Sequence, residues 1–307
     1  MAEDYNILTI LGPTAGGKTS VATRMAYILN GEVISADSRQ VYRGMDLGTG
    51  KDLDDYVVEG KKIPYHLIDI VDAGSKYNVY EFQQDFIHVF KDLQFRNKFP
   101  VLCGGSGMYI EAVLKGYKLI HVPVNESLRD NLNQKPTEEL IAILASYKKL
   151  HNTTDIDTRK RMIRAIEIEA YYAEHPQTDT EFPEIKPLLV GVKFDRKSQR
   201  KRITERLKQR LAEGMIDEVK QLIGRGITVE NLLYYGLEYK FITQHITGEL
   251  GYEEMFTKLE TAIHQFAKRQ MTWFRRMERN GFEIHWLDGY APMYEKTNRI
   301  LALLGKR

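Results

Sequence analysis

The sequence predicts an α/β fold in which helices flank a parallel β-sheet and a small, mostly helical domain is inserted. Short apolar segments alternate with segments of helical spacing in the first and last thirds of the chain, which is typical of a parallel sheet. Between about residues 125 and 172 the strand signals stop and helical spacing remains. A glycine-rich segment, residues 12–19, lies at the first strand-to-helix junction. These three observations predict the fold class.

The first third of the chain is expected to alternate strands and helices. Residues 6–11 are a short apolar run that ends in glycine, and residues 18–29 follow with apolar side chains at helical spacing. Residues 32–36 read as a second strand. A helix across residues 80–95 leads to a further strand at residues 100–103. Parallel strands joined by helices are the arrangement that this order predicts.

The middle of the chain is interpreted as a helical insertion. We expect the insertion to span residues 121–184 and the α/β core to comprise residues 1–120 and 185–307. Helices are expected to start at residues 136–137 and 157–158, and a proline-bearing loop at residues 175–187 leads back to the core. The elements expected beyond it are a strand at 188–194, an amphipathic helix over 203–222 broken near Gly214, a long helix around 252–279, a strand at 283–287 and a closing helix.

Composition is that of an ordinary globular protein. The chain has 307 residues, 43% of them hydrophobic and 28% charged. Its single cysteine, Cys103, excludes an intrachain disulfide and a cysteine-rich zinc site, and we expect a buried thiol at a strand end. The first residues resemble neither a signal peptide nor a membrane span, so we expect a cytoplasmic protein without a membrane partner.

The distribution of basic and acidic residues along the chain says more about nucleic-acid binding than the net charge does. The net charge is only +2, which by itself says little about nucleic acid. Basic residues cluster at 159–164, 196–210 and 268–279, whereas residues 46–59 are rich in acids. This distribution is compatible with a basic face.

The segment GPTAGGKT matches the phosphate-binding loop pattern and lies after a strand and before a helix, as that pattern requires. Its glycines allow backbone N–H groups to point at phosphate oxygens, Lys18 reaches a terminal phosphate, and the Thr19 hydroxyl is a ligand for Mg²⁺. The core is therefore expected to be P-loop NTPase-like. The predicted donor and phosphate site consists of Gly12, Pro13, Thr14, Ala15, Gly16, Gly17, Lys18 and Thr19.

The loop alone does not identify the reaction, because triphosphatases, kinases and diphosphate-using transferases all need such a cradle. Asp37 lies at the carboxyl end of the second strand, where an open sheet binds its ligand. Its spacing fits an outer Mg²⁺ ligand, a base for a kinase or a helix cap. GGSGMY at 104–109 and HLIDI at 66–70 are not specific alone, and we expect His66 in the core.

Together these segments resemble the tRNA dimethylallyltransferases, also called tRNA isopentenyltransferases, over nearly the whole chain. The matching segments, in family order, are GPTAGGKT, ADSRQVYRGMDLGTGK, HLIDI, VLCGGSGMY, RKRMIRAIE, RITERLKQRLAEGMIDEV and QFAKRQMTWFRR.

The resemblance implies transfer of a dimethylallyl group from dimethylallyl diphosphate to the exocyclic amine of the adenosine immediately 3′ of a tRNA anticodon, position 37. Asp37 matches the family's general base, and Arg206 matches the arginine that contacts the diphosphate. With Lys18 and Thr19 they complete the implied catalytic set, which would use Mg²⁺. The expected partners are the tRNA anticodon loop and dimethylallyl diphosphate, and we expect a monomer.

The resemblance also implies an RNA-binding surface, onto which the adenine is flipped out of the anticodon loop. The basic C-terminal helix adds Lys268 and Arg269, while Trp273 and Phe274 are expected in the core. The residues expected to contact tRNA are Asp37, Ser38, Arg39, Gln40, Ser106, Arg129, Arg161, Met162, Ile163, Arg164, Ala165, Lys268 and Arg269.

Three other functions share parts of this pattern. An adenylate isopentenyltransferase that modifies free AMP or ATP needs the loop and the aspartate but not the insertion. A small-molecule P-loop kinase needs the same phosphate cradle. A non-catalytic RNA-binding module leaves the complete phosphate cradle unexplained.

Overall fold

The computed structural model describes residues 5–148, 156–175 and 182–306. The chain forms two compact units: Met1–Gly116 together with Pro183–Arg307, and Tyr117–Phe182. The sequence placed the insertion at residues 121–184. The expected return loop at 175–187 lies partly outside the described residues, since 176–181 are not among them.

The larger unit is built on a six-stranded sheet with the order β10-β9-β1-β8-β2-β6, and every pair in it is parallel. β1 (Ile7–Leu11) lies at its centre, between β8 (Phe99–Gly104) and β9 (Pro187–Lys193). The outer strands are β2 (Gly31–Ser35), β6 (Tyr65–His66) and β10 (Ile284–Asp288). β1 and β2 are buried along their whole length, because helices cover the sheet.

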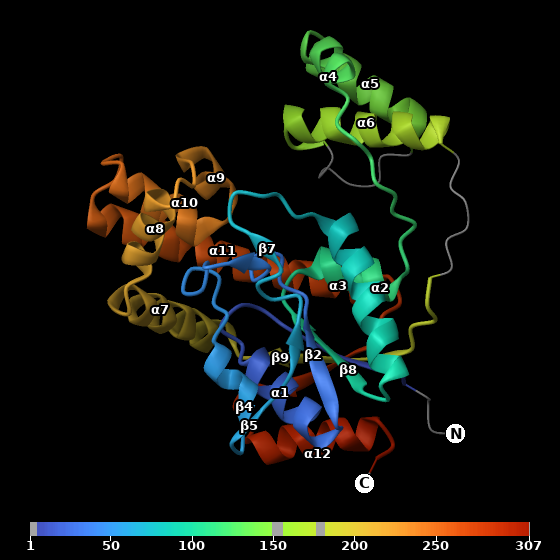
Figure 1. The fold of residues 1–307 in the computed structure, drawn as a ribbon, viewed down its shortest axis with the longest axis vertical. Helices are drawn as coiled ribbons and strands as arrows, with labels where there is room; N and C mark the ends of the chain where they lie inside the picture. The colour runs from blue at the N-terminus through green and yellow to red at the C-terminus, as the bar shows by residue number, and fades with distance from the viewer. Residues whose placement is uncertain (1–4, 149–155, 176–181, 307) are drawn as a thin grey trace. The chain divides into compact units, whose positions relative to one another are not determined.

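Helices cover the sheet on both faces (Figure 1). Leu8 and Ile10 of β1 share an apolar cluster with α1 (Lys18–Ile28) and α12 (Met293–Leu303), so these two helices cover one face. On α2 (Val79–Phe95) the apolar residues Phe82, Phe86 and Phe90 are fully buried. The helix α3 (Gly107–Leu114) packs beside α2. The α/β sheet flanked by helices is thereby confirmed.

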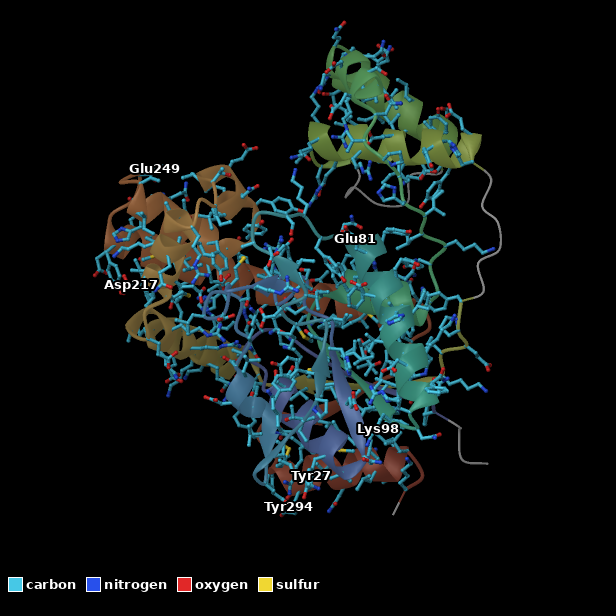
Figure 2. The ribbon with its side chains drawn as sticks, in the orientation of Figure 1. Tyr27, Glu81, Lys98, Asp217, Glu249 and Tyr294 are labelled. Carbon is cyan, nitrogen blue, oxygen red and sulfur yellow. The ribbon has the colours of Figure 1, made fainter. Side chains whose placement is uncertain are left out.

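The first residues of α2 show why that helix begins where it does. The Asn78 side chain accepts hydrogen bonds from the N–H groups of Tyr80 and Glu81, and Glu81 Oε2 (labelled in Figure 2) accepts from Asn78 N at 2.7 Å. This reciprocal cap satisfies N–H groups that have no partner within the helix. The helix starts within a residue of the predicted position.

The carboxyl half of the larger unit is mostly helical. Gly214, with φ of 101°, ends α7 (Arg196–Ala212) and begins α8 (Met215–Gly224), which confirms the predicted break. The long helix α11 (Tyr252–Arg279) matches the prediction at both ends. The helices α9 (Val229–Tyr234) and α10 (Leu237–Ile246) were not predicted, and α10 packs on both α9 and α11.

The chain between β2 and α2 contains short elements that the sequence did not predict: β3 (Tyr42–Arg43), the 3-10 helix η1 (Leu53–Tyr56), β4 (Val57–Val58), β5 (Lys61–Lys62) and β7 (Val71–Asp72).

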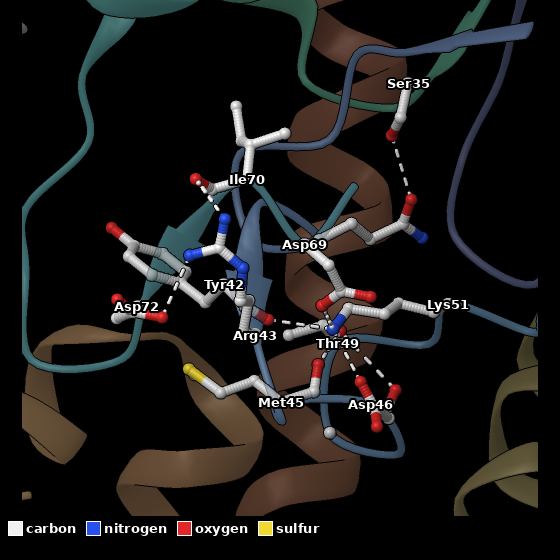
Figure 3. A network of polar contacts seen from close by, with 12 residues as sticks. Ser35, Tyr42, Arg43, Met45, Asp46, Thr49, Lys51, Asp69, Ile70 and Asp72 are labelled. Carbon is white, nitrogen blue, oxygen red and sulfur yellow. Dashed lines mark hydrogen bonds and ion pairs between the residues drawn. The ribbon is translucent and has the colours of Figure 1, made fainter. Parts of the chain in front are cut away.

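A buried lysine organises the first part of this segment (Figure 3). Lys51 is 1% exposed, and its Nζ donates to Tyr42 O at 2.8 Å and to Asp46 Oδ1 at 2.5 Å, and also to Asp69. Glu218 of α8 accepts three further backbone N–H groups, from Asp46, Leu47 and Gly48. Charged side chains therefore supply the hydrogen bonds that this loop, which makes no β-sheet hydrogen bonds, needs for its backbone.

The smaller unit consists of α4 (Glu126–Asn133), α5 (Thr137–Tyr147) and α6 (Arg159–Glu174) around an apolar core of its own. Thr158 caps α6 by accepting from Arg161 N. In the part of the chain that the structure describes, no helix combines the length and apolar character that a membrane span requires.

Candidate active site

Three loops meet at the carboxyl ends of neighbouring strands. Residues 12–17 follow β1, residues 36–40 follow β2, and residues 105–106 follow β8. Ser106 N donates to Ala36 O at 3.3 Å and Ser38 N donates to Ser106 Oγ at 3.1 Å, so the second and third loops are joined directly. This edge of a parallel sheet is where such folds bind ligands.

The first loop is a closed cradle. Gly16 N donates to Pro13 O at 3.2 Å, and Ala15 and Gly17 adopt left-handed φ values of 58° and 72°. A Cβ at Gly12 would lie 2.5 Å from Val192 O of β9. Gly12 is therefore required for packing against the sheet, whereas Gly17 is required for the turn into α1.

Two glutamine side chains from other helices form hydrogen bonds with the backbone of the cradle. Gln270 of α11 accepts from Thr14 N at 2.8 Å and donates to Gly105 O at 3.0 Å, and it is only 7% exposed. Gln199 of α7 donates to Thr14 O. Gln270 thus contacts two of the three loops. Neither glutamine was predicted from the sequence, although a glutamine on the otherwise apolar face of a long helix, as Gln270 is, was a usable signal.

Lys18 begins α1 and turns back over the loop, where its Nζ donates to Pro13 O at 2.8 Å. Burial lowers the pKa of Lys18, and the positive charge of Arg206 lowers it further, while Asp37 raises it. Lys18 contacts Pro13 of the cradle, Arg206 lines a cavity with Thr14 and Ala15, and Asp37 follows β2 at the same edge of the sheet. Three of the four residues assigned to catalysis from the sequence therefore lie at this edge.

Thr19 is the fourth, and it lies directly after Lys18 in the first turn of α1. Its hydroxyl has no hydrogen-bond partner among the described residues. The neighbouring Ser20 Oγ donates to Asp55 Oδ2 at 3.2 Å. Among those residues no group of three or more histidine, cysteine, aspartate or glutamate side chains is placed to hold a metal ion. A cation here would need oxygen atoms from a ligand.

Arg206 reaches the site from α7. Its guanidinium lines a small cavity with Thr14, Ala15, Arg210 and Glu238. Burial lowers the pKa of Arg206 to about 10, and the charge of Arg210 acts in the same direction. Burial raises the pKa of Glu238. The cavity thus contains cations whose charge is only partly compensated, which suits an anionic ligand.

The loop after β2 presents Asp37 and its neighbours. Asp37 Oδ1 accepts from Arg39 N at 3.0 Å. The amide of Gln40 bridges Ser35 Oγ at 2.9 Å and Gly50 O at 3.0 Å. The Arg39 guanidinium lies 5.3 Å from the centre of the Tyr234 ring, which is 46% exposed. Gln40 therefore fixes the loop.

The protein-family comparison decides the family. The model described as IPP transferase matches residues 40–277. The chain belongs to the IPP transferase family. A protein named tRNA dimethylallyltransferase 2 from Bacteroides fragilis is 60% identical over 96% of both chains, and one of the same name from Phocaeicola vulgatus is 59% identical over 98% of both.

Solved structures agree with this membership. The crystal structure of a full-length tRNA isopentenylpyrophosphate transferase from Bacillus halodurans has a TM-score of 0.70 and 31% identity, and the match covers 98% of this chain and 97% of that one. A eukaryotic dimethylallyltransferase described as acting on tRNA has a TM-score of 0.77 at 21% identity, covering 97% of this chain and 78% of that one. The latter likeness supports the fold alone.

In this IPP transferase, the residues assigned to RNA on the smaller unit divide into two groups. The side chains of Met162, Ile163 and Ala165 are at most 8% exposed and belong to the apolar core of that unit. Their side chains pack on α4 and α5, and their assignment to tRNA stays a prediction. The exposed cation Arg161 makes an ion pair of 3.2 Å with Asp157.

Arg129 and Arg164 surround the buried carboxylate of Glu167. Arg129 donates to its two oxygens at 3.0 and 2.8 Å, and Arg164 donates to Oε2. Arg164 also donates to Val122 O at 2.9 Å. Removal of either arginine would therefore disturb the unit itself as well as any contact with RNA.

On α11 of this family member, Lys268 and Arg269 are exposed, and Arg269 lies over the ring of Phe266. Phe274 is fully buried, as expected, and Trp273 packs on Gly107 and under the Arg276 guanidinium. Cys103 is 6% exposed in β8, which confirms the expected buried thiol near a strand end, and burial raises the pKa of this thiol to about 12. His66 has the hydrogen-bond partner expected of a satisfied histidine, Glu32 at 2.7 Å, but its side chain is 24% exposed on an outer strand, so its expected place in the core was wrong.

Proposed function

We propose that the chain transfers a dimethylallyl group from dimethylallyl diphosphate to the exocyclic amine of the adenosine 3′ of a tRNA anticodon, giving N6-dimethylallyladenosine and diphosphate. The observation that carries the proposal is the placement of Lys18 and Arg206 against the cradle, with Asp37 on the loop that follows β2 at the same edge of the sheet. Cations for a leaving group and a carboxylate for a proton then lie within one site. The names of its close relatives support the same reaction.

The cations act on the leaving group. When the allylic carbon–oxygen bond breaks, its electron pair stays with the diphosphate, which gains negative charge. The cradle N–H groups other than those of Thr14 and Gly16, which are bonded within the protein, act with Lys18 and Arg206 on this charge. These donors are held by the fold before the reaction, so they stabilise the charge with little reorganisation. Arg206 is planar and suits two phosphate oxygens at once.

The carboxylate of Asp37 acts on the nucleophile. An adenine amine is weakly nucleophilic, and it becomes strongly acidic once its nitrogen bonds to the allylic carbon. Asp37 then accepts the proton that the amine loses. Its Oδ1 is held by Arg39 N at 3.0 Å, which orients the carboxyl group.

The acceptor must leave the base stack of the anticodon loop to reach Asp37. We assign RNA contacts to Ser38, Arg39 and Ser106 beside the site, and to Lys268 and Arg269 on α11. Arg161 and Arg164 of the smaller unit extend this set. Cations of this kind bind phosphates and do not read sequence.

Mg²⁺ fits the site on one observation, the unpartnered Thr19 hydroxyl at the start of α1. Thr19 Oγ and diphosphate oxygens would hold the ion, which needs few protein ligands because it retains waters. The ion supplies positive charge that offsets the charge of the leaving group.

The proposal is tested by incubating the purified protein with dimethylallyl diphosphate, Mg²⁺ and bulk tRNA, followed by nucleoside analysis by mass. We expect a prenylated adenosine, and its absence would refute the proposed reaction. Asp37→Asn should lower turnover about 10²- to 10⁴-fold while donor binding persists. The matched control is Asp54→Asn, which neutralises an exposed carboxylate on η1. Free AMP as acceptor should remain unmodified.

A further inference from the structure

A carboxylate of the protein itself already occupies the arginines of the donor site. Asp52 Oδ2 accepts from Arg206 at 3.0 Å, and Asp52 Oδ1 accepts from Arg210 at 2.8 Å. The side chains of Arg206 and Arg210 are 28% and 11% exposed, whereas that of Asp52 is 44% exposed. One partly exposed anion thus bridges two largely buried cations.

The backbone holds this carboxylate in place. Asp52 has a left-handed φ of 42°, and it precedes η1 as its N-cap residue without capping it through its side chain. Two residues earlier, Gly50 has φ of 69°, and a Cβ there would lie 2.3 to 2.6 Å from the two guanidinium groups. The loop is therefore in close contact with the arginines, and its conformation directs Asp52 to them instead of to the helix end.

A diphosphate would need the same donors. Carboxylate and phosphate oxygens both bind a guanidinium through its planar fork, which offers a limited number of N–H groups in one direction. In the free protein Arg206 gives one of them to Asp52. A donor that binds Arg206 must displace the carboxylate or share the guanidinium with it, and the two anions repel one another.

We propose that Asp52 is an internal competitor for the diphosphate and so determines the affinity of the site for prenyl donor and for released diphosphate. This inference rests on the proposed function, in which Arg206 binds the diphosphate. Asp52 compensates the buried arginines while the site is empty. It weakens binding of the donor and, equally, of the diphosphate product, whose release it therefore favours.

The test measures binding of inorganic diphosphate with Mg²⁺ by calorimetry, because this probe needs neither tRNA nor turnover. Asp52→Asn removes the charge and keeps a side chain that tolerates left-handed φ. We expect its dissociation constant to fall about 2- to 5-fold, the range for losing one partly exposed charge interaction. Asp52→Gly, which also accepts this φ, should give the same direction and excludes an effect of the amide.

Asp54→Asn is the matched control, since it removes an equal charge two residues further along, within η1, and it should leave the dissociation constant unchanged. Equal or weaker diphosphate binding by both Asp52 variants would overturn the inference, because Asp52 would then not compete. Equal tightening by Asp54→Asn would also overturn it, since the effect would be one of net charge. Failure of the wild-type protein to prenylate tRNA would instead count against the proposed function, so the two failures are distinguishable.

Discussion

Replacing Gln270 by leucine removes the two hydrogen bonds through which α11 holds the loops after β1 and β8. The side chain accepts from Thr14 N at 2.8 Å and donates to Gly105 O at 3.0 Å. Leucine has a similar volume and suits the buried face of the helix. The substitution therefore tests the hydrogen bonds with little change in packing.

The expected cost follows from the groups that lose a partner. Gly105 is buried, and an unsatisfied buried carbonyl costs about 1–3 kcal/mol. Thr14 is half-buried, so water can replace part of its bond, and its loss costs about 1 kcal/mol. We therefore expect Gln270→Leu to lower the free energy of unfolding by about 2–4 kcal/mol.

Urea denaturation followed by tryptophan fluorescence measures this change in the larger unit, because both tryptophans, Trp273 and Trp286, belong to it. The matched control is Gln265→Leu, the same substitution at an exposed position of the same helix, which should cost less than about 0.5 kcal/mol. Prenylation assays on the same variants should show kcat/KM reduced about 10- to 100-fold only for Gln270→Leu, because the cradle and the acceptor loop lose their common support.

Two results would refute this reasoning. Unfolding of Gln270→Leu at the same urea concentration as the Gln265→Leu control would show that the two hydrogen bonds contribute nothing net to stability. Destabilisation of Gln270→Leu with wild-type kcat and KM for both substrates would show that the two bonds support the fold without positioning the site.

Three further predictions concern charge. The pKa of Glu32 is lowered to about 2, chiefly by its hydrogen bonds to Arg96. The free energy of unfolding of the wild type should therefore fall by roughly 2–3 kcal/mol relative to that of Glu32→Gln between about pH 5 and about pH 2, as measured by denaturation at each pH. Parallel pH profiles of the two proteins would contradict this prediction. Lys51 is 1% exposed, and Lys51→Met leaves the carboxylates of Asp46 and Asp69 without their cation. The substitution should lower the free energy of unfolding, measured in urea, by about 2–4 kcal/mol. An unchanged urea midpoint would show that the ion pairs of Lys51 are dispensable for stability. Lys268→Ala and Arg269→Ala should each lower the slope of log tRNA affinity against log salt by about one and leave diphosphate binding unchanged; an unaltered slope would remove α11 from the RNA interface.

Much of the fold was predictable because its periodicities are local. The strands β1, β2, β8, β9 and β10 and the helices α1, α2 and α11 were predicted within about one residue of their ends. Short elements such as β3, β7 and η1 were not predicted. Two to four residues are too few to show a hydrophobic periodicity, and distant partners determine their conformation. The loop that contains Lys51 is one example, because Glu218 of α8 satisfies its backbone.

The sequence was sufficient to predict which residues form the site, but it did not predict which distant side chains contact them. The cradle motif and Asp37 follow from sequence because a strand, a glycine loop and a helix lie in one continuous segment. The family resemblance added Arg206. It also assigned Met162, Ile163 and Ala165 to RNA, although the three-dimensional packing of the smaller unit buries them.

The sequence by itself determined that this protein has a phosphate cradle at the edge of a parallel sheet, because that motif needs only neighbouring residues. Only the tertiary structure decided what surrounds the cradle. Gln270 lies 256 positions from Thr14, and Arg206 lies 154 positions from Asp52, yet each pair is within hydrogen-bond distance. Such pairs form when separate helices pack on the sheet, and no local periodicity records which side chains then meet.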